Sequence, residues 1–526
     1  MKYGGLLSDL FRMPDGSRYS CVILLAAFIF SSIPTLAQSA DHNTAKEIRG
    51  LIKEAARATR NESLDNAEAL LRRAVELDPT RNDTKIELAY VLTKKRRLLD
   101  AYDLCVPIAE KEPKNSRALA VVGATLLSAG RFKEAEIVLA NSIKQNRKED
   151  LAWAGLGMLD FYENRIENSF YALVRANEYK PNEPDYLFAL AQVAGRAEKF
   201  TFSAEKYEEF LRVSNKNDID RRARIKGLIR FLRVLGQTGP LYASHGSDRS
   251  SIHFDLVGDR PIVELSINDS TPLRFVLDTG SGISVLSEAT AKRLKIDPVT
   301  RGGYARGIGG TGKFEIVYGL LREVDIGDVN IKNIPVFIRK FHDANRDVDG
   351  YIGLALLSKF LTTIDYGSHT FSLTKKEADS TAFQRDQLRS LPLRLTSSGF
   401  LSGEVQVEGV EAPLNFIVDT GASVSVISER VAKTDKVSMF LNDQKMQVIG
   451  SAGVRDDVPT FLLPRVTFGK NTQKSVMAVA LDLDVINETS GFEQAGILGG
   501  NFLKNYRLTF DFKNSKVVFE SVTPDN

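Results

Sequence analysis

The sequence of 526 residues predicts a multidomain protein in which an all-α repeat solenoid is followed by an all-β region made of two similar halves. Three observations support this fold class. In the first part of the chain, small residues and prolines recur at intervals of 34 positions. From about residue 252 the hydrophobic pattern changes to the alternation that is typical of half-buried strands. Within this second part, one long stretch occurs twice at a constant offset of 141.

The composition argues against several classes of function. Hydrophobic residues make up 43% and charged residues 26% of the chain, which is ordinary for a globular protein. The formal net charge is +3, so the chain has no strong field that would favour nucleic acid or an anionic membrane. Two cysteines and five histidines are too few and too scattered for a zinc site, and we expect no metal or other cofactor.

The first part of the chain, 1–37, has the pattern of an export signal. Basic residues precede a short apolar run at 21–30, and the small residues Thr35 and Ala37 favour cleavage after Ala37. The run is short for a membrane span, which needs about 20 apolar residues. We therefore expect a signal peptide at 1–37 and a mature protein without a stable membrane span, in the bacterial periplasm or outside the cell. The alternatives are an uncleaved N-terminal anchor and translation from Met13.

The 34-position period runs through several independent columns of the sequence. Small residues in such columns let the two helices of a hairpin approach closely, and a proline cannot continue the second helix. The pattern resembles the tetratricopeptide repeat family, whose period is 34. We count five repeats, at 48–81, 82–115, 116–149, 150–183 and 184–217, and expect a capping helix at 221–237. The columns are Pro79, Pro113 and Pro181; Ala67, Ala101 and Ala135; and Ala89, Gly123, Gly157 and Ala191.

The predicted helical domain spans 45–237. A repeat solenoid stacks helix pairs and presents a concave groove, so we expect this domain to dock a protein partner or a protein substrate. A spacer role is the alternative. Cys105 lies in an apolar stretch of the helical pattern, where a small buried residue is expected. The stretch 236–251 contains Gly, Pro and Ser and is interpreted as a linker, with His245 as a solvated loop residue.

The β region carries the same local pattern in both halves. LRFVLDTGSGISVLSEATAK at 273–292 and LNFIVDTGASVSVISERVAK at 414–433 are identical at eleven of 20 positions. In each, an apolar ramp ends in Asp-Thr-Gly, and each half later contains an apolar-apolar-Gly turn, in GYIGLALL and GILGGNFL. We place the two halves at 252–376 and 389–524.

On these motifs, each half resembles a retropepsin-type aspartic protease subunit, and the pair resembles a fused, pepsin-like dimer. The resemblance implies two β-barrels and a catalytic pair formed by Asp278 and Asp419. It also implies that Thr279 and Thr420 brace the two loops by crossed hydrogen bonds. The later turns, which are implied to support the loops from behind, lie at 352–353 and 497–499.

The two predicted acids suit hydrolysis by an activated water. Two carboxylates in contact cannot both ionise, so they share one proton. The ionised partner can take a proton from water, and the protonated partner can stabilise the charge that develops on a scissile carbonyl. Gly280 and Gly421 allow the tight turn that brings each loop close to the other. Ser281 can hydrogen-bond its neighbouring aspartate whereas Ala422 cannot, so we expect the two acids to be inequivalent.

Two glycine-rich hairpin tips are predicted to cover the site as flaps. The first lies at 305–316 and the second at 448–457. Glycine at a hairpin tip suits a mobile lid. Tyr304 and Tyr318 flank the first flap and are candidates for the tyrosine of pepsin-like flaps. The glycines assigned to the flaps are Gly307, Gly309, Gly310, Gly312, Gly450 and Gly453.

The sequence therefore predicts an exported aspartic endopeptidase that takes polypeptide substrates, with a repeat domain that docks substrates or protein partners. A non-catalytic peptide- or protein-binding scaffold that keeps the protease fold is the alternative. A homodimeric site, in which each half pairs with a half of another chain, is also open. The fused arrangement is simpler, because the connection near 374–392 is long enough for the two halves to face each other.

Overall fold

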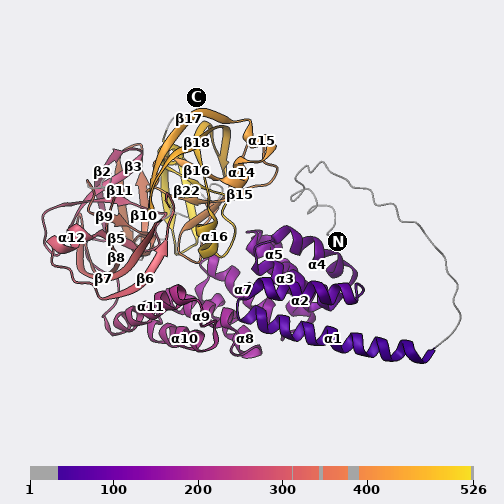
Figure 1. Cartoon of the computed structure of the whole chain (residues 1–526). Coiled ribbons are helices and arrows are strands. Elements are labelled where there is room, and N and C mark those ends of the chain that lie inside the picture. The colour runs from indigo at the N-terminus through magenta and orange to yellow at the C-terminus, as the bar shows by residue number, and fades with distance from the viewer. Residues whose placement is uncertain (1–33, 311, 343–346, 377–389, 523–526) are drawn as a thin grey trace. The chain divides into compact units, whose positions relative to one another are not determined.

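The structure is a computed structural model that describes residues 34–310, 312–342, 347–376 and 390–522 (Figure 1). The chain forms two compact units. One contains the described residues up to 156 together with 178–183, and the other contains 157–177 and the described residues from 184 onward. The predicted signal peptide lies outside the described residues except for its last four positions, which begin the first helix. Among the described residues, no helix combines the length and the hydrophobicity that a membrane crossing requires.

The first unit is built from helical hairpins that repeat along the chain. The helices α3, α5 and α7 begin at positions 82, 116 and 150, which is the period that the sequence predicts. Gly123 shows why small residues recur, because a Cβ atom there would lie 2.6 Å from the side chain of Leu139. Cys105 is fully buried, as expected, and burial raises the pKa of its thiol to about 12. The helices are α1 (Pro34–Arg60), α2 (Leu64–Leu77), α3 (Asn82–Lys94), α4 (Leu98–Lys111), α5 (Ser116–Ser128), α6 (Phe132–Gln145) and α7 (Asp150–Tyr162), and the end of α7 belongs to the second unit.

The second unit begins with the last helices of the solenoid. These are α8 (Ile166–Tyr179), whose last two residues belong to the first unit, α9 (Pro184–Arg196), α10 (Phe200–Val213) and α11 (Ile219–Gln237). The starts of α7 and α9, at 150 and 184, and those of α8 and α10, at 166 and 200, keep the same spacing, so the period continues to the end of the repeats. The predicted capping helix is α11. Its residues Ile225, Ile229 and Leu232 share an apolar cluster with side chains of α9 and α10.

The β region of the second unit has two similar halves. The first contains β1 (Ala243–Gly246), β2 (Arg249–Val257), β3 (Arg260–Ile267), β4 (Leu273–Leu277), β5 (Ser284–Ser287), α12 (Glu288–Arg293), β6 (Thr300–Arg306), β7 (Lys313–Ile326), β8 (Val329–Arg339), β9 (Gly350–Ile352), α13 (Leu354–Leu357), β10 (Phe360–Asp365) and β11 (Thr370–Lys375). The second contains β12 (Ser390–Pro392), β13 (Arg394–Leu395), β14 (Leu401–Val407), β15 (Leu414–Val418), β16 (Ser425–Ser428), α14 (Glu429–Ala432), α15 (Asp435–Ser438), β17 (Leu441–Gly450), β18 (Gly453–Phe468), β19 (Asn471–Leu481), α16 (Asp484–Ser490), β20 (Gly496–Leu498), α17 (Gly500–Leu503), β21 (Tyr506–Asp511) and β22 (Lys516–Ser521).

Each half closes into a barrel with the same strand order. In the first half the order is β3-β4-β9-β5-β8-β7, and β3 also pairs with β7. In the second half the order is β14-β15-β20-β16-β19-β18, and β14 also pairs with β18. The duplication predicted from the sequence is therefore a duplication of the whole barrel.

A shared sheet joins the two halves of the β region. Its strands run in the order β12-β22-β21-β10-β11-β2, and β10 pairs antiparallel with β21 at its centre. There Thr363 lies opposite Thr509, with their hydroxyl oxygens 3.2 Å apart. The strands β10 and β21 hold equivalent places in their halves, so the sheet relates the barrels by an approximate twofold axis.

The region predicted as a linker, 236–251, contains β1 and the start of β2. The strand β5 covers only one end of its edge of β8, and β1 pairs with the other end, where Ser244 lies opposite Ile331. His245 is exposed, as expected, but it belongs to this strand and not to a loop. An unpaired strand edge readily accepts another strand, which explains why this polar stretch becomes part of the sheet.

Candidate active site

Two loops of the same design follow β4 and β15 and carry the predicted aspartates. The strands β9 and β20 run parallel beside β4 and β15 and lead into the later apolar-Gly turns. The N–H of Asp278 donates to the carbonyl of Ile352 at 3.0 Å. In the same way, the N–H of Asp419 donates to the carbonyl of Leu498 at 3.0 Å. The later turns therefore fix both aspartate loops from behind.

The two loops are tied together by their threonines. The hydroxyl of Thr279 donates to the carbonyl of Val418 at 2.7 Å. The hydroxyl of Thr420 donates to the carbonyl of Leu277 at 2.6 Å. Each hydroxyl also accepts the N–H of the opposite threonine at 3.1 Å. Both threonines are fully buried, so this crossed net aligns the loops without help from water.

Replacing Thr420 by Val is expected to destabilise the fold by about 2 to 6 kcal/mol, because it leaves two buried backbone groups unpaired at about 1–3 kcal/mol each. These groups are the N–H of Thr279 and the carbonyl of Leu277. Val has nearly the same volume as Thr, so packing changes little. Thr420→Ser keeps the hydroxyl and is the matched control. Chemical unfolding measures both variants, and equal stability of the two would contradict a structural role for the net.

The threonine net brings the two carboxylates into contact. Asp278 and Asp419 are half-buried, and their side chains hydrogen-bond each other. The adjacent glycines permit this approach. A Cβ atom at Gly280 would lie 2.3 Å from Cγ of Asp419, and one at Gly421 would lie 2.7 Å from Cγ of Asp278. A side chain at either glycine would therefore displace the opposite acid.

The two carboxylates are inequivalent. Oδ1 of Asp419 accepts the N–H groups of Gly421 at 2.8 Å and Ala422 at 3.1 Å. Oδ1 of Asp278 accepts the N–H of Gly280 at 2.9 Å. Burial, and next the charge of Asp419, raises the pKa of Asp278 well above its ordinary value. Burial also raises the pKa of Asp419, but the hydrogen bond from Asp278 and the backbone N–H groups oppose this effect and favour the ionised form of Asp419.

The source of this inequivalence differs from the sequence-based expectation. The hydroxyl of Ser281 donates to the carbonyl of Ile283 at 2.8 Å and is not directed to Asp278. Ala422, which has no polar side chain, supports Asp419 through its backbone N–H. The backbone of the second loop, rather than Ser281, therefore distinguishes the two acids.

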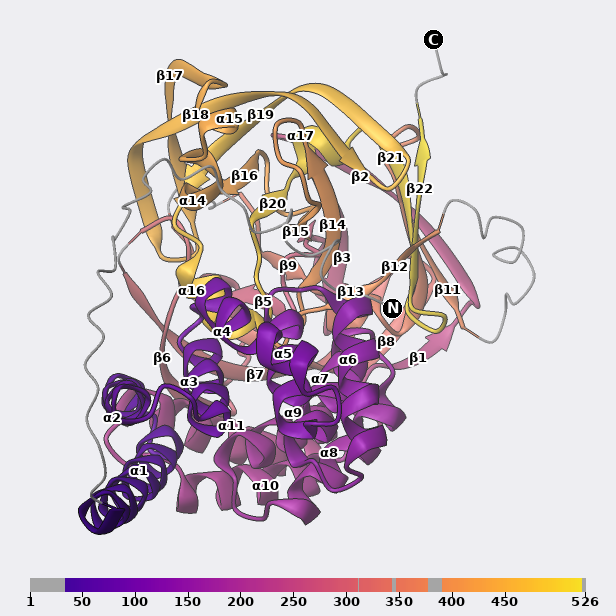
Figure 2. The same ribbon diagram turned by 90° about the vertical axis from the view of Figure 1, so that its right-hand side faces the viewer.

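The predicted flaps are the hairpins β6–β7, called flap 1, and β17–β18, called flap 2 (Figure 2). Their tips contact each other. The N–H of Ala452 donates to the carbonyl of Ile308 at 2.9 Å, and the N–H of Ile308 donates to the hydroxyl of Ser451 at 3.2 Å. The side chain of Ile308 packs against an apolar cluster that contains Ile417 and Ile497, which flank the Asp419 loop. The tips therefore meet against the wall of the site.

The predicted flap glycines all lie at these two tips. Glycine is required where the tips touch, because a Cβ atom at Gly309 would lie 2.5 Å from the nitrogen of Gly450. Gly309 also has a φ of +82°, which favours glycine. The same crowding applies to a Cβ atom at Gly307, which would lie 2.0 Å from the hydroxyl of Ser451. At Gly310 and Gly312 the neighbour is the carbonyl of Ala452, in both cases at 2.6 Å. Gly453 has a φ of +132°.

The tyrosines proposed for the flap occupy other places. Tyr318 is buried and stacks on Phe231 of α11, with ring centroids 4.5 Å apart, whereas Tyr304 is 54% exposed. Among the described tyrosines, Tyr351 of β9 and Tyr366 are the ones whose hydroxyls interact with the charges of the aspartates. Burial raises the pKa of the Tyr351 hydroxyl, and the charge of Asp278 raises it further. The sequence analysis missed Tyr351, whose only signal is its place directly before the apolar-Gly turn.

Helix α11 packs against β6, the outer strand of flap 1. A Cβ atom at Gly227 would lie 2.2 Å from Cα of Gly302, so the two backbones touch. Arg224 donates to the carbonyl of Tyr304 at 3.1 Å. Arg230 donates to the carbonyl of Arg301 at 2.9 Å and to the hydroxyl of Thr300 at 3.0 Å. The capping helix of the solenoid therefore holds one flap directly.

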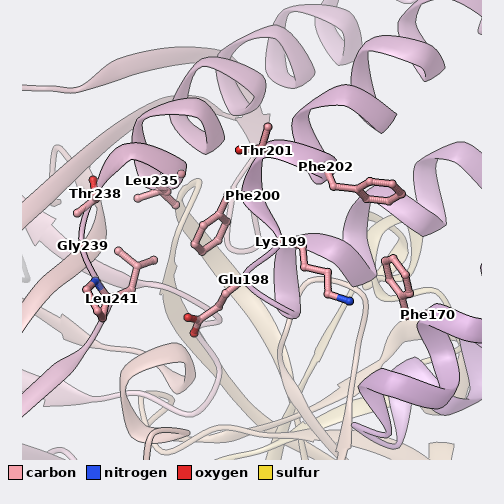
Figure 3. Close-up of a pocket in the computed structure, with 12 residues that line it drawn as sticks. Phe170, Glu198, Lys199, Phe200, Thr201, Phe202, Leu235, Thr238, Gly239 and Leu241 are labelled. Atoms are coloured by element: carbon pink, nitrogen blue, oxygen red, sulfur yellow. The ribbon is translucent and has the colours of Figure 1, made fainter.

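A separate hollow of about 500 Å³ lies among the last helices of the solenoid and the segment after α11 (Figure 3). Figure 3 shows Lys199 extending toward Phe170, and the Nζ atom lies 4.1 Å from the centre of that ring. Glu198 pairs with Lys359 of the β region. The charged groups of this hollow thus serve contacts within the protein. The other lining residues are Phe200, Thr201, Phe202, Leu235, Gly236, Thr238, Gly239, Pro240 and Leu241.

Two β-barrels with a hydrogen-bonded aspartate pair on crossed Asp-Thr-Gly loops define the aspartic protease class of fold. In the described part of the chain, no group of three or more His, Cys, Asp or Glu side chains is placed to hold a metal ion. Residues 263–356 and 403–502 match the aspartyl protease family. The β region therefore consists of two aspartyl protease-type halves, and each matched segment contains one of the loops. No curated protein matches the sequence.

The helical part is similar to solved tetratricopeptide repeat structures. A thermophilic TPR protein of Thermus thermophilus has 16% identity and a TM-score of 0.30, with 35% of this chain and 98% of that chain covered. PilF of Pseudomonas aeruginosa has 16% identity and a TM-score of 0.28, with 37% of this chain and 89% of that chain covered. The assignment of the helices to a repeat solenoid rests on their regular spacing along the chain.

Proposed function

We propose that the protein is an aspartic endopeptidase. The observation that carries the proposal is the hydrogen-bonded pair of Asp278 and Asp419 on crossed loops. This pair places an acid and a base at one point, which is the requirement for hydrolysis by water without a covalent intermediate. The flaps supply a cover that can exclude bulk water from that point.

The proposed reaction follows from the inequivalence of the two acids. Asp419 is the ionised partner and takes a proton from a water molecule bound between the carboxylates. The water oxygen bonds to the scissile carbonyl carbon while Asp278 donates a hydrogen bond to the carbonyl oxygen. The tetrahedral species then collapses, the C–N bond breaks, and the amine leaves with the proton from Asp419. The pair retains one shared proton for the next cycle.

A mixture of unstructured peptides incubated with the purified full chain tests the proposal. We expect internal cleavage at acidic to neutral pH, slowed by pepstatin-like inhibitors. Peptide binding without cleavage under all conditions would overturn the proposal in favour of the non-catalytic scaffold.

Activity is expected to depend on pH with a bell-shaped profile. On the alkaline side it falls when Asp278 loses the shared proton, and the raised pKa of Asp278 moves this limb above the ordinary value of about 3.9 for an aspartate. On the acid side, activity falls when Asp419 is also protonated, so that the pair holds two protons. The measurement is kcat/KM against pH with one uncharged peptide. A profile that stays flat across both limbs would contradict the shared proton.

Gly450→Ala is expected to lower kcat/KM by about 10- to 100-fold, because a Cβ atom there would lie 2.3 Å from the carbonyl oxygen of Ile308 and keep the flap tips apart. The loss should appear mainly in KM, since the acids themselves are untouched. Gly239→Ala is the matched control, because its Cβ atom would have only an ordinary contact of 3.6 Å with Asn333. Unchanged kinetics for Gly450→Ala would show that tip contact is unnecessary.

We further propose that the solenoid docks a protein substrate or partner and that the protein is exported. A helical repeat array presents an extended surface for such docking, and the N-terminal sequence has the pattern of a cleaved signal. N-terminal sequencing of the cell-derived protein tests the second point. We expect a start at Gln38, and retention of residues 1–37 would favour an anchor.

A further inference from the structure

The duplication allows the two walls of the site to be compared residue by residue. Tyr351 of β9 lies opposite Val276 and Val285, and Ile497 of β20 lies opposite Ile417 and Val426. Tyr351 and Ile497 therefore occupy equivalent positions. Their difference is the first sign that the two walls have different chemistry.

Two arginines extend this difference. Arg339 pairs with Ser287 in the first half, and Leu481 pairs with Ser428 in the second. Ile262 of β3 lies opposite Val276, and Ser402 of β14 lies opposite Ile417, so Arg260, two residues before Ile262, is equivalent to Phe400. The first half therefore carries two cations and a phenol at positions where the second half carries the apolar side chains of Phe400, Leu481 and Ile497.

The wall of the second half is apolar. Leu481 and Ile497 are 2% and 5% exposed and belong to one cluster with Ile417, Val426 and Val458. Such a wall suits an aliphatic or aromatic side chain of a bound peptide, because burial of apolar surface is its main source of affinity.

Arg339 is already engaged. Its guanidinium lies 3.6 Å from the ring centre of Phe314 in flap 1, and it donates to the carbonyl of Ser451 in flap 2 at 2.7 Å. This arginine therefore connects the two flaps.

Arg260 is different. Among the described residues it has no ion pair, and its Nε atom is buried without a hydrogen-bond partner. The neighbouring carboxylate of Asp259 is bound by Lys504 at 3.2 Å. Ile262 of β3 lies opposite Val276 of β4, and this register, continued by two residues, brings Arg260 level with Asp278 on the first-half side of the aspartate pair. Its positive charge acts on Asp278 and on the hydroxyl of Tyr351. A buried donor without a partner is unfavourable, and a bound group can satisfy it.

We propose that Arg260 forms a subsite for an acidic substrate side chain, Asp or Glu, at one position on one side of the scissile bond, while the apolar wall of the second half takes an aliphatic or aromatic side chain on the other side. The proposal rests on the proposed endopeptidase function and specifies its substrate class. A guanidinium binds a carboxylate through two parallel hydrogen bonds, so an amide of the same shape is a poorer ligand.

Cleavage-site profiling of a peptide library tests the subsite. The wild-type protein should show one position at which Glu is preferred to Gln by roughly tenfold, since a site built for a charged group discriminates against its neutral analogue. Arg260→Leu, which removes the positive charge, should bring that Glu-to-Gln ratio close to one. Arg260→Lys should keep part of the preference, and Arg260→Glu should reverse it in favour of Lys or Arg. Arg322→Leu, a change at a 71% exposed arginine of β7, is the control and should leave the ratio unchanged.

Two results would overturn the subsite. One is the absence of any acidic preference in the wild-type profile, and the other is an unchanged Glu-to-Gln ratio in Arg260→Leu. If the wild-type protein cleaves no peptide, the endopeptidase proposal fails by itself, and the subsite is tested by binding. Paired fluorescent peptides that differ only by Glu and Gln are then titrated into the wild-type and Arg260→Leu proteins, where a Glu preference lost in the variant supports the subsite and equal affinities overturn it.

Discussion

Asp278→Asn and Asp419→Asn are each expected to reduce peptide hydrolysis by about 10²- to 10⁴-fold, which is the usual contribution of a positioned acid or base. An amide can neither take a proton from water nor exchange the proton that the two carboxylates share. Both variants should unfold cooperatively, because the crossed threonine net does not involve the carboxylates. Near-normal activity in either variant would show that the intramolecular pair is not the catalytic site.

The same variants carry an expected effect on stability. The pKa of Asp278 is raised in the folded protein, so the folded state binds its proton more tightly than the unfolded state. The stability that this proton confers is complete below the unfolded pKa of about 3.9 and is lost as pH rises through the folded pKa. The amide in Asp278→Asn does not ionise, so this variant does not lose that stability as pH rises. Its unfolding temperature should be higher than that of the wild-type protein at neutral pH and nearly the same at strongly acidic pH. Asp443→Asn, at an exposed carboxylate of β17, is the control, and equal shifts in both variants would contradict this account.

Gly227→Leu is expected to have the largest effect outside the aspartate loops. Its Cβ atom would lie 2.2 Å from Cα of Gly302 and 2.6 Å from the carbonyl oxygen of Arg301, and backbone atoms on both elements cannot move aside cheaply. We expect a loss of about 1–3 kcal/mol or more in the free energy of unfolding, as in other overpacked contacts. We also expect a reduced kcat/KM, because β6 loses the helix that supports it.

The experiment for this contact combines thermal unfolding with peptide-cleavage kinetics. Gly50→Leu is the matched control, since Gly50 also lies in a helix and a Cβ atom there would meet nothing within 4 Å. Gly227→Leu should be clearly less stable and less active than Gly50→Leu. If the two variants behave alike, α11 does not support flap 1.

The aspartate loops could be predicted from the sequence because their function depends on a short motif that occurs twice at one offset. Asp278, Asp419 and the threonines that cross between them required only this repetition and the resemblance it supports. The glycines of the two flap tips could be predicted for a separate, local reason, because a glycine-rich run such as 307–312 is typical of a hairpin tip.

The remaining features depend on contacts that no local pattern shows. Ser281 has a hydroxyl beside Asp278 in sequence, but its rotamer directs that hydroxyl to Ile283. Tyr318 lies at the base of flap 1, but its ring stacks on Phe231 of α11, the helix that packs there. Arg260 and Tyr351 lie far apart in the sequence, and only the register of the strands brings both of them beside the aspartate pair. Their part in the site could therefore be recognised only in the structure.

The pairing of β10 with β21 has a kinetic and an evolutionary consequence. A site assembled from two separate copies falls apart on dilution, whereas one closed within a single polypeptide assembles by a first-order step and keeps its activity at any concentration. Each barrel is also encoded separately, so a substitution on one side is not copied on the other, and the two sides can differ, as Arg339 and Leu481 do.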